Sequence, residues 1–180
     1  MFVLGIDPGL SRCGYGAVRR EAGAMTAVAA GVLRTPAGDD LPQRLATLAA
    51  DLRELLADLR PDAVAVERVL FQVNERTAMS VGQASGLALV AAAEAGVPVF
   101  QYSPNEVKQA VTGYGAAGKE QVQRMVQSLL GLVERPHPPD AADALGLAIC
   151  HLNAAPLLAR VAAHGAKTAG DAARGEERPA

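Results

Sequence analysis

The sequence predicts an α/β fold in which helices cover both faces of a five-stranded mixed sheet. Three apolar, strand-like segments come first, at residues 2–7, 14–20 and 25–35. Two shorter apolar segments, residues 63–67 and 97–101, each follow a segment with helical periodicity. Short connections make the first three strands antiparallel, whereas strands that follow crossover helices run parallel to the first.

Turn residues and apolar runs justify the strands in order. Glycine-containing turns around residues 9–14 and 21–23 separate the first three strands. The fourth strand, "AVAVE" at residues 63–67, has no polar alternation, which indicates that both of its faces are covered. The fifth strand is "VPVFQ" at residues 97–101.

Leucine periodicity and helix-end signals justify the helices. The first helix, residues 41–59, has leucines at steps of three and four, and Pro61 ends it. The second, residues 75–95, stops at Gly96. The sequence "SPNE" at 103–106 predicts a capping box at the start of a short third helix.

The last helices follow a glycine-rich loop, "GYGAAG" at residues 113–118. One helix is expected at 119–130, and another begins after "HPPD" and runs past His151. Residues 164–180 combine small and charged residues without periodicity, so we expect one folded domain at 1–163 followed by a disordered tail.

Composition excludes several classes of protein. The 180 residues suffice for one domain with a full core, and only 2 are cysteine, too few for a disulfide framework or a zinc site. We expect a cytoplasmic protein without a signal peptide or a membrane span, because the longest uncharged stretch, residues 77–93, is too polar. The net charge of −2 argues mildly against a nucleic-acid partner.

Four acidic residues form the candidate site. Asp7 ends the first strand and Glu67 ends the fourth, so parallel pairing places both carboxylates at the ligand-binding edge of the sheet. Asp140 and Asp143 are three apart and share one face of the last helix's first turn. The structural alternative is that Asp140 caps this helix and Asp143 faces its dipole.

Four converging carboxylates predict a metal site. They would repel one another unless cations joined them, and ligands that are all oxygen select Mg²⁺ or Mn²⁺. Two such ions about 3.5–4 Å apart form the clamp that enzymes use for phosphoryl displacement by water.

Five separated motifs carry a family resemblance. They are "GIDPGLSRCGYG", "VAVERVLF", "GQASGLALVAA", "VKQAVTGYGAAGKEQVQRMV" and "DAADALGLAICH". In this order and spacing they resemble the RuvC family of Holliday junction resolvases, which has a ribonuclease H-like fold. The resemblance implies that the four acids bind two metal ions, and that a homodimer nicks two strands of like polarity symmetrically at a four-way DNA junction. It also implies roles in recombination and repair beside the bacterial branch-migration machinery.

The resemblance also implies DNA contacts. Lys108 and Lys119 would approach the DNA backbone near the scissile phosphate, although both also fit solvated surface lysines. Arg76 is a weaker candidate for a phosphate contact. The family has an aromatic residue three positions after the strand-four glutamate, where this chain has Leu70 followed by Phe71, so either is a candidate wedge between junction bases.

Local charge answers the objection from net charge in part. Without the four predicted metal ligands, 15 of the 19 acidic residues remain against 17 basic ones, so the DNA-facing edge can be basic.

Arg12, in the turn after Asp7, is interpreted as a surface residue. "GQASG" at 82–86 predicts either close packing on the sheet or a contact between subunits, and Gly146 is expected to weaken the last helix.

Two other functions fit parts of the sequence. A strand that ends in aspartate before a glycine-rich turn also opens sugar kinases and actin-like ATPases, but these need two such domains and further phosphate-binding motifs. A non-catalytic junction-binding scaffold of the same fold is the second alternative. Loss of one of the acids would indicate the scaffold, and all four are present.

Overall fold

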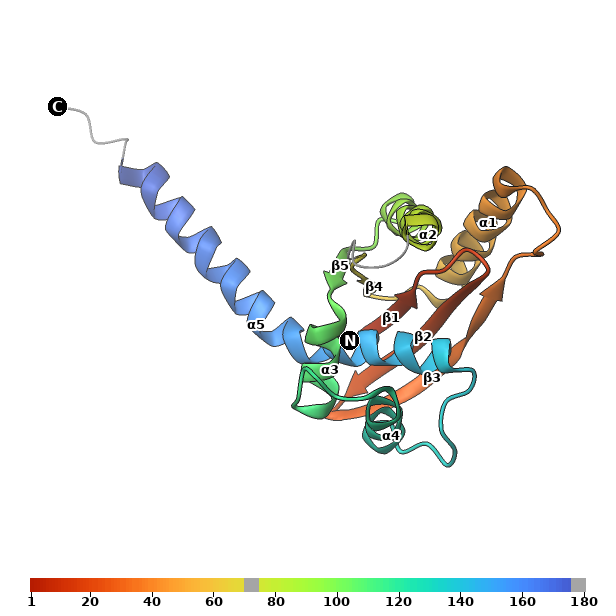
Figure 1. The fold of residues 1–180 in the computed structure, drawn as a ribbon. Coiled ribbons are helices and arrows are strands. Elements are labelled where there is room, and N and C mark those ends of the chain that lie inside the picture. The colour runs from red at the N-terminus through yellow and green to blue at the C-terminus, as the bar shows by residue number, and fades with distance from the viewer. Residues whose placement is uncertain (70–74, 176–180) are drawn as a thin grey trace.

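A computed structural model describes residues 1–69 and 75–175 of the chain (Figure 1). Within these residues, five strands form one sheet in the order β3-β2-β1-β4-β5. The strands are β1 (Phe2–Asp7), β2 (Arg12–Glu21), β3 (Ala24–Arg34), β4 (Ala63–Glu67) and β5 (Val99–Tyr102). The first three pair antiparallel, whereas β4 and β5 run parallel to β1. The predicted mixed sheet is confirmed.

Helices cover both faces of this sheet, as predicted. They are α1 (Leu41–Leu59), α2 (Glu75–Glu94), α3 (Pro104–Thr112), α4 (Lys119–Leu129) and α5 (Pro139–Gly175). One core lies between the sheet and α1 and α2, and a second lies between the sheet and α3, α4 and α5 (Figure 1). Each core therefore buries one set of alternating strand side chains, such as Leu4 and Ile6 on one face and Val3 on the other.

The start of α5 lies directly on the backbone of β1 and β2. A Cβ atom at Gly5 would come within 1.9 Å of the Ala144 carbonyl oxygen, and one at Gly14 within 2.3 Å of the Asp140 carbonyl oxygen. A Cβ at Gly16 would come within 2.6 Å of the Leu145 amide nitrogen. Because only glycine permits this approach, these positions fix where the first turns of α5 sit over the sheet.

The helix ends follow their sequence signals closely. The predicted capping box of α3 is present, because the Ser103 hydroxyl accepts from the Glu106 amide at 3.3 Å while the Glu106 carboxylate accepts from the Ser103 amide at 2.7 Å. Gly146, expected only to weaken the last helix, has a packing reason. A Cβ there would lie 3.3 Å from Val107 Cγ1, so its absence lets α5 approach α3 closely.

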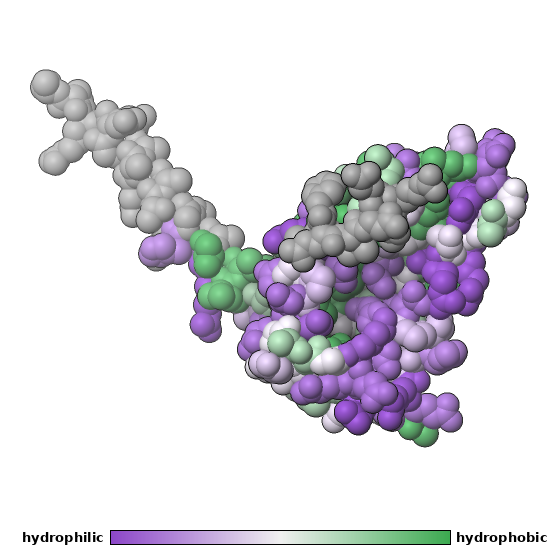
Figure 2. Space-filling view, viewed as in Figure 1, coloured by the Kyte–Doolittle hydropathy of each residue, from purple (hydrophilic) through white to green (hydrophobic). Residues whose placement is uncertain are grey.

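The structure differs from the sequence prediction at the C-terminal segment. We expected disorder from residue 164, but α5 continues to Gly175 and projects away from the sheet (Figure 1). Residues 164–175 contain 4 alanines, the best helix formers, and although 3 glycines lower the helix propensity, the segment only has to extend a helix that is already formed. Where α5 leaves the domain it has an exposed hydrophobic patch of Leu157, Leu158 and Val161 (Figure 2). The assignment of residues 1–163 as the functional domain stays a prediction.

A basic side chain from β2 supports α5 where a proline interrupts it. Pro156 lies inside α5 and has no N–H to donate to the Leu152 carbonyl one turn earlier. Arg20 supplies the missing donor, because its Nη1 donates to the Leu152 carbonyl and its Nη2 donates to the Asn153 side chain at 2.6 Å. The helix therefore continues through the proline while one side of it is held by the sheet.

Candidate active site

Two neighbouring strands bring the first two acids together. β1 and β4 pair in parallel with Ile6 opposite Val66, so Asp7 and Glu67 follow side by side at the carboxyl edge of the sheet. Asp140 and Asp143 reach the same edge from the first turns of α5, which the glycine contacts hold against β2. The structure therefore brings together all four acids that the sequence predicted.

The carboxylates at this edge repel one another. Burial, together with repulsion from Glu67, Asp143 and Asp140, raises the pKa of Asp7 from its ordinary 3.8 to about 7. Burial also raises the pKa of Glu67, with Asp143 contributing, while Lys119 and Lys108 oppose the increase. Carrying negative charge on all four acids is therefore unfavourable without nearby positive charge.

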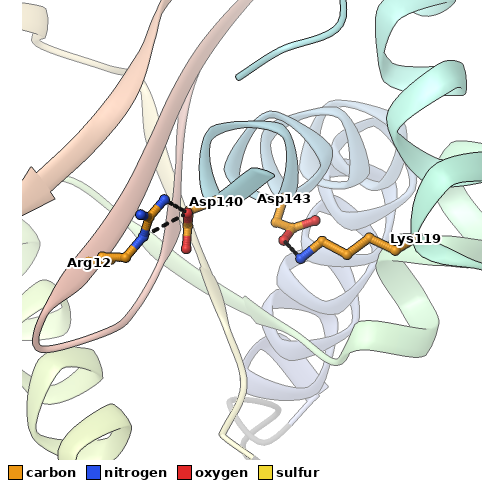
Figure 3. A network of polar contacts seen from close by, with 4 residues as sticks. All are labelled: Arg12, Lys119, Asp140 and Asp143. Carbon is orange, nitrogen blue, oxygen red and sulfur yellow. Dashed lines mark hydrogen bonds and ion pairs between the residues drawn. The ribbon is translucent and has the colours of Figure 1, made fainter. Parts of the chain in front are cut away.

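Both predicted lysines lie beside the acids. Lys119, the first residue of α4, donates from Nζ to Asp143 Oδ2 at 2.9 Å, and this hydrogen bond raises the pKa of the lysine (Figure 3). Lys108 lies on α3 across the same cleft, which has a volume of about 250 Å³. The cleft is lined by Glu67, Pro104, Val107, Lys108, Lys119, Val122 and Asp143. Lys119 is therefore part of the site, not simply a solvated surface lysine.

The other candidate DNA contacts are less completely described. Leu70 and Phe71 lie outside the described residues. Arg76 lies in the first turn of α2, and its side chain is likewise outside what the structure describes.

Arg12 is a residue of the site that sequence reasoning missed. Arg12 is exposed, as predicted, but its Nε lies 3.1 Å and its Nη2 2.5 Å from Asp140 Oδ2, a contact that the prediction did not include. Figure 3 shows Asp140 turned toward Arg12 and Asp143 turned toward Lys119. No local signal reveals this contact, because 128 positions separate its two partners.

The capping alternative for Asp140 is also wrong. Because α5 begins at Pro139, Asp140 lies inside the first turn and not at the capping position. Burial acts to raise the pKa of Asp140, but hydrogen bonds from Arg12 and from its own backbone outweigh burial and leave the pKa below its ordinary value. The carboxylate is therefore held by the sheet as well as by its helix.

The donor chemistry fits hard divalent cations. Within residues 1–69 and 75–175, no three His, Cys, Asp or Glu side chains have the spacing of an assembled metal site. The four acids nevertheless offer only oxygen donors, and their mutual repulsion is what a bound cation relieves.

The family model for the crossover junction endodeoxyribonuclease RuvC matches residues 3–151. This chain belongs to the RuvC family. The match includes all four acids and both lysines of the cleft.

Curated relatives agree with the RuvC assignment along nearly their whole length. The RuvC of Moorella thermoacetica is 55% identical over 156 residues, which cover 87% of this chain and 93% of that protein. The RuvC of Chloroflexus aggregans is 52% identical over 160 residues, covering 89% of this chain and 98% of the relative.

Solved structures show the same RuvC fold. Thermus thermophilus RuvC superposes with a TM-score of 0.80 at 42% identity, covering 87% of this chain and 96% of that one. The T. thermophilus protein in complex with its Holliday junction substrate gives a TM-score of 0.82 with the same identity and coverage. The ribonuclease H-like fold predicted from the sequence is confirmed.

Proposed function

We propose that this protein resolves Holliday junctions by making paired, symmetric nicks in two strands of like polarity. The observation that supports this most strongly is the placement of four acids at one sheet edge in a chain of the RuvC family. The presence of all four acids disfavours the non-catalytic scaffold. The RuvC match over 87% of this chain and 93% of the relative disfavours a fragment of a sugar kinase or actin-like ATPase.

Asp7, Glu67, Asp140 and Asp143 are the proposed metal ligands. Nucleases of the RuvC family depend on metal ions in general, and we propose two Mg²⁺ ions per site, with Mn²⁺ as an alternative. When bound, such ions activate the attacking water and stabilise the leaving oxygen. Asp7 and Glu67 are fixed by paired strands, so they supply the rigid half of the ligand set.

The basic residues of the cleft are the proposed contacts to the scissile strand. Lys108 and Lys119 line the same cleft as Glu67 and Asp143, which suits binding of a phosphate beside the ligands. Arg76 is proposed to contact a more distant phosphate, and Leu70 or Phe71 to wedge between bases at the exchange point. Stacking on an aromatic ring is worth about 1–3 kcal/mol per base, which favours Phe71 over Leu70.

The outer face of α2 is the proposed dimer contact. In the "GQASG" segment, Ala84 and Ser85 are buried against the protein's own core. A Cβ at Gly82 or Gly86 would meet nothing within 4 Å, so packing on the sheet does not account for these two glycines. Two copies related by a two-fold axis match the symmetry of two cuts on one junction.

A substitution on this face tests the dimer. Gly86→Glu places a charge on the open face of α2 while improving helix propensity, so the monomer fold is expected to remain intact. Sedimentation should then show monomers, whereas Gly38→Glu, at an open loop position, should remain dimeric. Two monomeric proteins, or two dimeric ones, would contradict the assignment of this face.

The proposed setting is the bacterial cytoplasm, beside the branch-migration machinery.

The enzymatic proposal is tested by Asp7→Asn. With Mg²⁺, the variant should fail to nick a four-way junction yet bind it nearly as well as the unsubstituted protein, because phosphate contacts elsewhere supply most of the affinity. Asp58→Asn, which changes an exposed acid of α1, is the matched control and should cut normally. Normal cutting by Asp7→Asn would refute the ligand assignment, and an unsubstituted protein that binds but never cuts would support the scaffold.

A further inference from the structure

We propose that Arg12 is a positioning residue that limits Asp140 to one metal-binding oxygen and thereby favours Mg²⁺ over larger cations such as Ca²⁺. This inference rests on the proposed role of Asp140 as a metal ligand.

The first support is the geometry of the contact. Arg12 directs both Nε and Nη2 at the same oxygen, Asp140 Oδ2 (Figure 3). Neither of these two hydrogen bonds goes to the other oxygen, Oδ1. A guanidinium that held both oxygens would block the carboxylate, whereas this arrangement leaves one oxygen for a ligand.

The second support is that the backbone next to Arg12 is held in place. The turn before it is anchored from α1, where Arg44 donates to the Ser11 hydroxyl at 2.5 Å and to the Thr35 hydroxyl at 3.0 Å. The buried Thr35 hydroxyl in turn donates to the Leu10 carbonyl at 2.6 Å. Ion pairs between mobile surface side chains contribute little, but these contacts fix the backbone from which Arg12 extends.

The backbone of Asp140, the partner of Arg12, is also held in place. Gly14, two residues after Arg12, contacts the Asp140 backbone so closely that a Cβ would lie 2.3 Å from the Asp140 carbonyl oxygen. The distance between the start of β2 and the start of α5 therefore has little freedom. Arg12 and Asp140 meet because the two elements that carry them are held at a fixed distance.

Mg²⁺ and Ca²⁺ differ in the number of carboxylate oxygens that they bind. Mg²⁺ takes six ligands at about 2.0–2.1 Å and uses few carboxylate oxygens, whereas Ca²⁺ takes six to eight at about 2.3–2.6 Å and accepts bidentate carboxylates. Lys119 similarly occupies only Oδ2 of Asp143. A site in which Asp140 and Asp143 of α5 each offer one oxygen suits the smaller ion, Mg²⁺. Removing Arg12 would free the second oxygen of Asp140, a ligand that mainly Ca²⁺ can use.

Metal binding to the full-length protein tests the proposal without reference to cleavage. Free Mn²⁺ is measured by electron paramagnetic resonance, and Mg²⁺ and Ca²⁺ are titrated in competition. In Arg12→Gln, the ratio of Mg²⁺ affinity to Ca²⁺ affinity should fall roughly tenfold, within the range found for hydrogen-bond partners of metal ligands. Arg12→Lys should lose the preference as well, because lysine keeps the charge but not the two-donor fork.

Arg19→Gln is the matched control, since it removes the same charge from the far end of β2 and should leave the ratio unchanged. Thermal unfolding of each variant verifies that it is folded. Three results would overturn the proposal: an unchanged ratio in Arg12→Gln, equal tightening of all ions, or an Arg12→Lys variant that behaves like the unsubstituted protein.

A separate pair of variants distinguishes this inference from the proposed function. Asp7→Asn and Asp140→Asn should each weaken Mn²⁺ binding at least about tenfold. If they do so while the Arg12 variants keep the original ratio, only the role of Arg12 is refuted. If they bind Mn²⁺ normally, the ligand set and the role of Arg12 fail together.

Discussion

Asp7→Asn should make the protein more stable at the same time as it removes the proposed activity. Asp7 is a buried carboxylate beside three other acids, and its pKa rises from 3.8 to about 7 on folding. At 1.36 kcal/mol per pH unit, ionised Asp7 destabilises the fold by about 4 kcal/mol. Burying the asparagine amide costs about 1–3 kcal/mol, so we expect a net gain of about 1–3 kcal/mol.

The sign of the pH dependence follows from the two pKa values. Below 3.8 Asp7 carries a proton in both the folded and the unfolded protein, so its charge costs nothing. Between 3.8 and about 7 the folded protein binds the extra proton, and the stability of the unsubstituted protein falls as pH rises. The advantage of Asp7→Asn should therefore grow across this interval and become constant above it.

Urea unfolding followed by circular dichroism measures this advantage. The free energy of unfolding is determined with a chelator present, at pH values near about 4, 6 and 8, which span the interval. Asp58→Asn, at an exposed position of α1, controls for loss of a negative charge. The reasoning is refuted if Asp7→Asn is no more stable than the unsubstituted protein near pH 8, or if its advantage is the same at every pH.

Three further predictions concern the helix that carries Asp140. Gly16→Ala should cost about 1–3 kcal/mol in unfolding free energy, because its Cβ would force α5 off the sheet. Arg20→Ala should cost about 1–3 kcal/mol by leaving the Leu152 carbonyl without a donor. In a double-mutant cycle, Arg20→Ala should cost less in the Pro156→Ala background, where the backbone amide at position 156 can donate to the Leu152 carbonyl. Additive effects of the two substitutions would show that Arg20 does not replace the missing donor. Truncation after residue 163 should leave melting temperature and cleavage unchanged, so a loss of several degrees would show that the distal part of α5 supports the fold.

Local patterns were enough to predict most of the fold. Leucine spacing predicted the bounds of α1, and an uninterrupted apolar run predicted β4. Both succeeded because the spacing of apolar residues along a segment depends on its secondary structure and on which faces are buried. The pairing of Asp7 with Glu67 was also predictable, since a crossover connection makes their strands parallel and parallel strands end at one edge. The assignment to a family of resolvases came from several motifs in one order.

Contacts between distant residues were decided only by the tertiary structure. The sequence shows only that Gly16 lies in a turn or strand. The structure shows why a side chain is excluded there, because α5 packs directly on its backbone. Likewise, Arg20 supports the helix at Pro156, and Arg12 holds Asp140, from positions more than a hundred residues away. A side chain's charge and size are visible in the sequence, whereas its partner depends on how rigid elements meet after folding. For this reason the sequence by itself determined which acids form the candidate site and that two lysines lie near them, and the tertiary structure decided that Arg12 binds Asp140 and Lys119 binds Asp143.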